Sequence, residues 1–280
     1  MSRPLVIVAG ILVVAGALWV IVAPRLRSST YAIELGKSWP AAERIAYDNV
    51  DHSAWNSLLG RYVDAEGLVN YRAWKASAED VSALDHYLEQ LSRVGPHKPS
   101  SREAKLAFWI NAYNAVTVRG ILRAYPTTSI RNLTSPVGYN IWEHLLLRVG
   151  DETFSLNTME HQILRKMGEP RIHFAIVCAS ISCPRLLNEA YTADHLDEQL
   201  TENARHFFAQ EQNFRIDKKA HRIFLSSILD WFGSDFGATQ AEQLARISPY
   251  LPNDEARQLA ASKNVTVSYL DYDWNLNEQH

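Results

Sequence analysis

The two cysteines of this 280-residue chain, Cys178 and Cys183, lie five positions apart in the segment HFAIVCASISCPRL, residues 173–186. His173 opens the segment, five positions before Cys178. A thiolate beside an imidazole can act as a nucleophile, two cysteines can form a disulfide, and cysteine with histidine can bind zinc. A free cysteine is also common in an apolar core, where it needs no chemistry. The residue types alone leave four interpretations of the segment open.

Spacing separates these interpretations only in part. The C-x4-C and H-x4-C spacings match no common zinc site, and the chain has no H-E-x-x-H motif, so we predict no metal site. A disulfide requires Cα atoms within about 4.4–6.8 Å, so the chain would have to double back through ASIS, residues 179–182. His173 and Cys178 would face opposite sides of an ideal strand, so a direct pair between them would require a bend.

Other polar residues with chemical potential stand in apolar surroundings. Glu160 and His161 are adjacent in MEHQIL, and Asn111 and Asn114 lie three positions apart within EAKLAFWINAYNAVTVRGILRA. On a helix that spacing places both amides on one face. A buried amide is costly unless its hydrogen bonds are met. We therefore expect the two asparagines either to hold buried backbone or to orient a catalytic imidazole.

The elements that must position these residues follow from hydrophobic periodicity. Glu103–Ala124, preceded by a cap at Ser100 or Ser101, is apolar on nearly every side and predicts a buried central helix. The apolar, β-branched run 172–177 predicts a buried strand ending at Cys178. We also expect strands at 145–149, 153–156, 214–216, 222–225 and 265–269. The pattern indicates an α+β fold, helix-rich, with the central helix packed on a small antiparallel sheet.

The N-terminus predicts a membrane anchor. Leu5–Ala23 is an uncharged apolar run, long enough at 1.5 Å per residue to approach the ~30 Å hydrocarbon core. A cleaved signal peptide is the alternative, but a cut after Ala23 would leave Pro24 at the new terminus. We favour one uncleaved transmembrane helix, with the lipid bilayer as a partner of residues 5–23. Flanking positive charges are nearly balanced, and we expect the main domain to be extracytoplasmic, on the periplasmic side.

The composition describes an ordinary folded domain: 47% hydrophobic residues, 21% charged residues and a net charge of −3. No run of lysine or arginine and no Gly-rich phosphate loop occurs. Nucleic-acid binding therefore has no support.

Several motifs together resemble one family. AFWINAYNAVTV, SLNTMEHQIL, RIHFAIVCASISCPRL, EAYT and DWFGSDFG occur in the order typical of DUF547 proteins, a family of unknown function. The resemblance covers residues 52–251, after an anchor at 1–27 and a connector with a first helix at 28–51; 252–280 would form a strand and a tail. The family has been compared with papain-like and transglutaminase-like folds. Its polar positions fall here on the following residues: Asn111, Asn114, Glu160, His161, His173, Cys178, Ser180 and Cys183.

The resemblance implies a fold more than a function. If the segment after residue 177, the Glu160–His161 turn and the helix with Asn114 converge, the residues would suit a thiol hydrolase or acyl transferase acting on an amide or thioester of a peptide-like substrate. Cys178 would be the nucleophile, His161 or His173 the base, and Asn114 or Glu160 the orienting group. Asn111, Ser180 and Cys183 would serve binding, Cys183 being the more dispensable cysteine, and no cofactor is implied. Papain-like chains run Cys before His, whereas here the histidines come first. The alternative is a membrane-tethered binding or scaffold module without chemistry.

Overall fold

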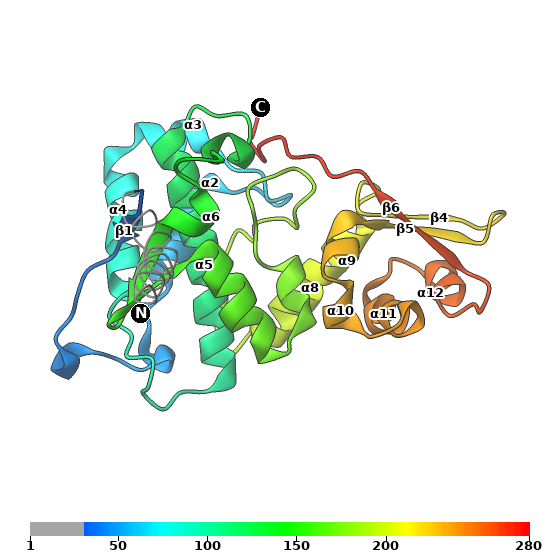
Figure 1. Cartoon of the computed structure of the whole chain (residues 1–280), viewed down its shortest axis with the longest axis horizontal. Helices are drawn as coiled ribbons and strands as arrows, with labels where there is room; N and C mark the ends of the chain where they lie inside the picture. Colours follow the sequence, from blue (N-terminus) through cyan, green and yellow to red (C-terminus); the bar gives the residue numbers. More distant parts are fainter. Residues whose placement is uncertain (1–30) are drawn as a thin grey trace, which may run out of the picture.

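A long buried helix, α5 (Arg102–Ala124), organises the larger part of the protein, as predicted (Figure 1). The computed structural model describes residues 31–280. Ser101 caps α5 by accepting a hydrogen bond from the Ala104 N–H, and every residue from Leu106 to Val118 is buried. At Gly120 a Cβ atom would lie 2.6 Å from a terminal methyl group of Ile141 and 2.9 Å from one of Leu145, so a larger residue would require these side chains to shift.

The remaining helices are short and mostly capped by side chains. They are α2 (Ser53–Tyr62), α3 (Tyr71–Ala76), α4 (Ala78–Leu91), α6 (Ile141–His144), α7 (Leu156–Thr158), α8 (Leu196–Ala209), α9 (Ser227–Trp231), α10 (Gly233–Phe236), α11 (Gln240–Ile247) and α12 (Asp254–Ala260). The predicted first helix before residue 51 is instead two 3₁₀ turns, Ala41–Glu43 and Tyr47–Asn49. Among residues 31–280, no helix has the length and apolar composition to cross a membrane. The predicted anchor at 5–23 lies outside the described residues.

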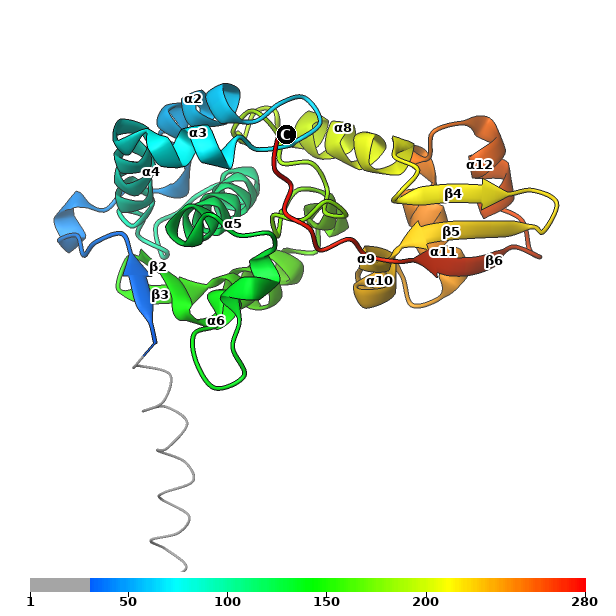
Figure 2. The ribbon, with the colours of Figure 1, turned by 90° about the horizontal axis from the view of Figure 1, so that it is seen from above.

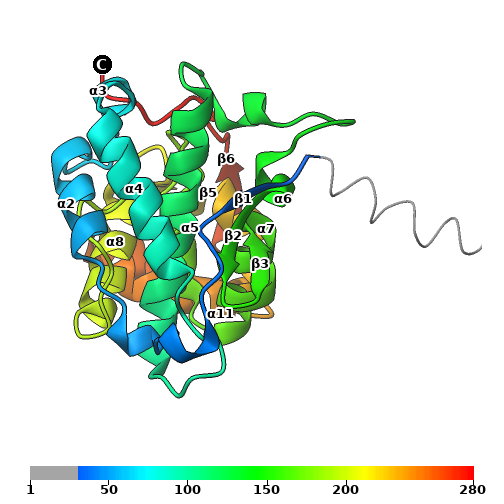
Figure 3. The ribbon, with the colours of Figure 1, turned by 90° about the vertical axis from the view of Figure 1, so that its left-hand side faces the viewer.

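Two small sheets complete the α+β fold. Their strands are β1 (Ile33–Leu35), β2 (Leu145–Val149), β3 (Glu152–Ser155), β4 (Phe214–Asp217), β5 (Arg222–Ser226) and β6 (Thr266–Leu270). The two predicted hairpins and the last strand are confirmed. The prediction of a purely antiparallel sheet is wrong, because β1 joins β2 and β6 joins β5 in parallel. The sheet β1–β3 lies beside α5 (Figure 3).

The protein has two lobes with separate hydrophobic cores. The first core surrounds α5, and the second lies between the sheet β4–β6 and helices α11 and α12 (Figure 2). Helix α8 contributes side chains to both cores, since Leu200 belongs to the first core whereas Phe207 and Phe208 belong to the second. The second core spans both sides of the boundary that the sequence placed at 251/252.

The predicted strand 172–177 is wrong. Pro170–Phe174 forms a 3₁₀ helix, started by Pro170 at its first turn and by a Glu169 carboxylate that accepts from the Arg171 N–H. The next residues are irregular, and the Asn114 side chain takes the place of a neighbouring strand. Its amide donates to the Ala175 carbonyl at 2.9 Å and accepts from the Val177 N–H at 2.9 Å. A short buried apolar run does not distinguish a strand from such a segment.

Residues 271–279, which we call the C-terminal strap, leave β6 and run back to the first lobe (Figure 2). Val69 donates its N–H to the Asn277 carbonyl at 2.8 Å, and Gln279 donates to the Val69 carbonyl at 3.1 Å. Leu276 is buried in the first core. The strap therefore connects the far lobe with the surface next to the cysteines.

Candidate active site

The cysteine loop reverses direction between Cys178 and Cys183. Ala179 adopts a left-handed conformation with φ 56°, and the Cys183 N–H donates to the Ser180 carbonyl at 3.1 Å. A non-glycine residue with positive φ is uncommon and recurs at functional sites. The reversal places the two sulfurs 2.6 Å apart, and both cysteines are free thiols. The chain doubles back as a disulfide clip would require, but the structure holds a dithiol.

The C-terminal strap holds this loop from the other side. Ile181 donates its N–H to Asn275 at 2.9 Å, and Ser182 accepts through its hydroxyl from the Asp273 N–H at 2.8 Å. The strap thereby brings the Tyr272 hydroxyl to 3.2 Å from the Cys178 sulfur and 3.1 Å from the Cys183 sulfur. It also lies 3.0 Å from the Ser180 hydroxyl.

This hydrogen bonding separates the acidities of the two thiols. Burial opposes ionisation of Cys183, but bonds from the Cys178 thiol, the Tyr272 hydroxyl and the Cys178 N–H at 3.0 Å outweigh it and lower the Cys183 pKa to about 7. The bond to Cys183 and burial raise the Cys178 pKa. Two such interacting thiols titrate as a pair. Cys183 is therefore the thiol that ionises first, while Cys178 keeps its proton.

Glu160 belongs to a one-and-a-half-turn π-helix, Met159–Leu164, which follows α7. Such wide turns are rare and often occur at functional sites. Burial raises the pKa of the Glu160 carboxyl to about 7, against a hydrogen bond from the Tyr113 hydroxyl at 3.2 Å, and the nearby Cys183 charge raises it further. A carboxyl with that pKa can donate or accept a proton near neutrality.

The two histidines of interest join a different network. His173 Nε2 lies 2.8 Å from Asp235, which also binds Arg165 at 2.6 Å, and Arg165 donates to His161 Nδ1 at 3.1 Å. Burial lowers the pKa of His173 despite Asp235; burial and then the Arg165 charge lower the pKa of His161. Both imidazoles are therefore neutral at pH 7. Within residues 31–280, neither sulfur has an imidazole among its hydrogen-bond partners.

These groups meet at one cavity of about 290 Å³ between the two lobes. Its lining combines the dithiol with acid, imidazole and aromatic groups: Tyr113, Trp142, Asn157, Glu160, His161, His173, Ile176, Cys178, Cys183, Pro184, Ile228, Trp231, Phe232, Tyr272 and Trp274. Cys178 and the Glu160–His161 turn thus line the same cavity. No cluster of three or more His, Cys, Asp or Glu residues that could hold a metal occurs in the described part of the chain.

The two asparagines of α5 support the site without lining the cavity. Asn111 donates to the Tyr191 carbonyl at 2.8 Å and accepts from the Tyr191 N–H at 3.0 Å. Asn114 likewise donates one hydrogen bond and accepts another, and both fix the backbone of residues 175–177, directly before Cys178. Both satisfy buried backbone, the structural alternative that the sequence left open.

Sequence reasoning missed the contributions of Tyr113, Asp235 and Tyr272. Asp235 lies in DWFGSDFG, a motif whose individual residues carry no predicted role. Tyr272 lies in DYDWNLN, within the predicted C-terminal tail. Tyr272 contacts Cys178 across 94 positions. No local pattern reports a contact of that range.

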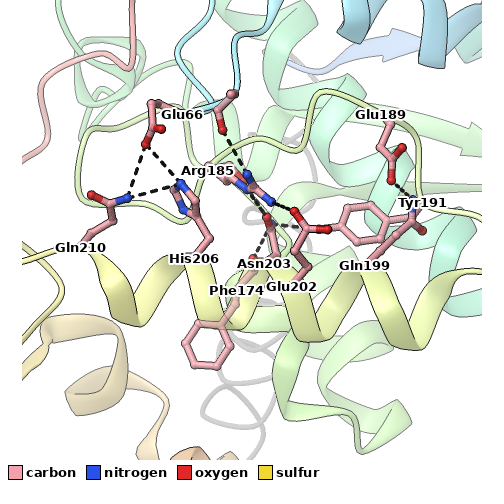
Figure 4. Close-up of polar contacts among 11 residues, drawn as sticks. Glu66, Phe174, Arg185, Glu189, Tyr191, Gln199, Glu202, Asn203, His206 and Gln210 are labelled. Atoms are coloured by element: carbon pink, nitrogen blue, oxygen red, sulfur yellow. Dashed lines mark hydrogen bonds and ion pairs between the residues drawn. The ribbon is translucent and has the colours of Figure 1, made fainter. Parts of the chain in front are cut away.

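A polar cluster around Asn203 on α8 fixes the chain on both sides of the cysteine loop (Figure 4). Its amide donates to the Phe174 carbonyl at 2.9 Å and to the Tyr191 hydroxyl at 3.0 Å. Its oxygen accepts from Arg185 at 2.7 Å. Asn203 thus joins the segment before Cys178 to the segment after Cys183.

Replacing Asn203 with alanine is expected to destabilise the fold by about 2–4 kcal/mol, because it leaves several buried polar partners without a hydrogen bond. Urea unfolding followed by tryptophan fluorescence measures the loss. The exposed Glu211→Ala variant is the control and should unfold at the wild-type midpoint. A wild-type midpoint for Asn203→Ala would show that the cluster contributes nothing to the fold.

Comparison with known proteins agrees with the resemblance read from the motifs. None of the curated proteins and none of the solved structures matches the chain significantly. One family model, described as "Protein of unknown function, DUF547", matches residues 97–208. That segment holds α5, the π-helix and both cysteines, whereas Tyr272 and Asp235 lie beyond it. Residues 97–208 therefore match the DUF547 family, in agreement with the motifs.

Proposed function

We propose that the protein is a cysteine-dependent acyl transferase or hydrolase that acts on an amide or thioester of a peptide-like substrate. One observation carries the proposal: two sulfurs in contact, of which Cys183 has a lowered pKa, open into the same cavity as a buried carboxyl group whose pKa is raised to about 7. Thiol acyl transfer requires both a nucleophile and a proton donor for the leaving group.

Cys178 is the attacking sulfur in this proposal. Cys178 is half-buried, whereas Cys183 is buried, so Cys178 is better placed to reach a substrate. Cys183 takes the Cys178 proton across 2.6 Å as the new C–S bond forms. Cys183 thereby does the work that the sequence assigned to His161 or His173.

The leaving group takes its proton from Glu160, which is protonated at the start of the reaction. After this step Cys178 carries the acyl group, Cys183 is a neutral thiol and Glu160 is a carboxylate. The Tyr272 hydroxyl remains protonated, since burial raises its pKa, and it can donate to the sulfurs throughout. Asp235 and Arg165 act as positioning residues, through their contacts with His173 and His161.

Alkylation tests the proposal. Under reducing conditions at pH 7, iodoacetamide should modify the dithiol at least about tenfold faster than an ordinary thiol with a pKa of ~8.5. The label should be on Cys178, the less buried sulfur, which passes its proton to Cys183. Peptide mapping by mass spectrometry identifies the modified residue. Thiols that stay unmodified until the protein is denatured would favour the alternative, a binding or scaffold module without chemistry.

Thiol–disulfide exchange is a second candidate, favoured by the contact between the two sulfurs. In that reaction Cys178 would attack a substrate disulfide, and Cys183 would release the mixed disulfide by forming a bond to Cys178. The Cys183→Ser variant separates the two functions. In acyl transfer it should still turn over repeatedly, although more slowly at pH 7, whereas in disulfide exchange it should accumulate the mixed disulfide and turn over no further.

We also propose that residues 5–23 anchor the protein in a membrane, with the cavity on the extracytoplasmic side. The support is the uncharged apolar run of that segment. Cell fractionation should find the full-length chain in the membrane pellet and resistant to extraction by carbonate. A full-length or N-terminally shortened chain in the soluble fraction would contradict the anchor.

A further inference from the structure

We infer that the acyl group is passed to a primary amine on an aliphatic stem, so that the cavity is the acceptor site of an amine acyltransferase. This inference rests on the proposed acyl transfer and adds the class of its second substrate. It follows from the charges and the aromatic surfaces that line the cavity.

The charge of the cavity is negative. No lysine or arginine is among the residues that line it, and His161 and His173 are neutral at pH 7. The Arg165 guanidinium, which donates to His161 of the lining, is neutralised by its two-point ion pair with Asp235 at 2.6 and 2.7 Å. The ionisable groups that face the cavity are Glu160 and the dithiol, both acidic. A cationic ligand would complement them, whereas an anionic one would be repelled.

The walls of the cavity are aromatic. Trp231, Tyr272 and Trp274 pack together with ring centroids 4.5–5.9 Å apart, and Trp142 and Phe232 line other parts of the wall. Trp231 remains 46% exposed, which is unusual for so large an apolar side chain. Aromatic faces attract ammonium groups through their electron-rich surfaces, and several such faces around one site are typical of amine recognition.

Two guanidinium groups of the protein already lie over rings that line the cavity. The Arg131 guanidinium lies 5.5 Å from the Trp274 ring, and that of Arg165 lies 5.3 Å from the Phe232 ring. The cavity volume of about 290 Å³ lies at the small end of ligand sites. It suits a single aliphatic chain with a terminal amino group better than a larger ligand.

The transfer step balances in atoms and protons. An entering ammonium loses one proton to solvent, and the neutral amine attacks the acyl carbon on Cys178, giving its second proton to the Glu160 carboxylate. The C–N bond forms as the C–S bond breaks, and the Cys178 sulfur takes back the proton held by Cys183. The products are an amide and the starting enzyme, with Cys183 ionised and Glu160 protonated.

The test compares three amines as acceptors for the acetyl group of phenyl thioacetate. n-Pentylamine, methylamine and 5-aminopentanoate have similar amino groups but differ in stem and charge. Amide and acetate products are measured by chromatography, and the reaction with the Cys178→Ser variant is subtracted as background. The ratio of amide to acetate should be at least about tenfold higher for pentylamine than for either other amine. Methylamine lacks the stem, of which each buried methylene strengthens binding ~3–4-fold, and the carboxylate of 5-aminopentanoate is repelled by the cavity.

Variants locate the acceptor site. Trp231→Leu should lower the amide-to-acetate ratio for pentylamine about tenfold; the ratio does not depend on the fraction of folded enzyme. Tyr31→Leu removes another exposed aromatic residue (43% exposed) outside the cavity, and should leave the ratio unchanged. Acetylation of Cys178 with equal ratios for all three amines would overturn this inference but not the proposed function. Absence of acetylation would overturn both.

Discussion

Replacing Cys178 with serine is expected to lower acyl transfer from phenyl thioacetate by at least about a thousandfold, to the level of the uncatalysed reaction. The reason is chemical: a serine hydroxyl at this position has no base strong enough to ionise it, since its neighbours are a thiolate and a carboxyl with pKa values of about 7. The initial burst of thiophenol release, followed at its absorbance maximum, measures acylation directly.

Cys183→Ser is the matched control for this prediction. It keeps the nucleophile but removes the thiolate that takes its proton, so Cys178 must lose its proton to solvent instead. At pH 7 we expect the burst rate to fall at least about tenfold, and to recover as the pH rises above ~8.5. The double variant should be no worse than Cys178→Ser, because the two sulfurs act as a unit. A full burst in Cys178→Ser and none in Cys183→Ser would assign the attacking sulfur to Cys183.

Replacing Glu160 with glutamine is expected to change both the pH profile and the stability. Activity requires an ionised dithiol and a protonated Glu160, and both groups titrate at about pH 7. The wild-type profile should therefore be a narrow bell near neutrality. In Glu160→Gln the alkaline limb should disappear, and cleavage of an anilide substrate should fall about 10²-fold, while a thioester, with its better leaving group, is affected less.

The effect on stability has a defined sign. The Glu160 pKa rises from 4.5 in the unfolded chain to about 7 in the folded protein. The free energy of unfolding therefore falls as the pH rises from about 4.5 to about 7, because the carboxylate forms more readily in the unfolded chain. Glu160→Gln should have wild-type stability at pH 4 and exceed it by on the order of 3 kcal/mol at pH 8. Urea unfolding at the two pH values measures the difference. The exposed Glu211→Gln variant should show no such dependence, and a pH-independent effect of Glu160→Gln would contradict the buried, raised pKa.

Features with a local cause could be predicted from the sequence. Periodicity placed the central helix within one residue of its start, and alternation with turn residues placed both hairpins. The strand 172–177 failed because its backbone bonds to the side chain of Asn114 rather than to a neighbouring strand. Glu160, His161 and His173 line the cavity, but their partners Tyr113 and Asp235 come from other elements. Their pairing depends on how the two lobes pack, which no spacing along the chain specifies.

Because the C-terminal strap is synthesised last, it also determines at which stage of synthesis the Cys183 pKa reaches its lowered value. Tyr272 lies 94 positions after Cys178 and 89 after Cys183. A ribosome adding ~5–20 residues per second makes both cysteines several seconds before the tyrosine that binds them. Throughout that interval the dithiol lacks the hydroxyl that helps to lower the Cys183 pKa, and the loop 179–183 lacks the backbone that holds it. A nascent chain that has not reached residue 272 therefore lacks part of the hydrogen bonding that lowers the Cys183 pKa, and the complete site arises only in molecules whose synthesis has passed that residue.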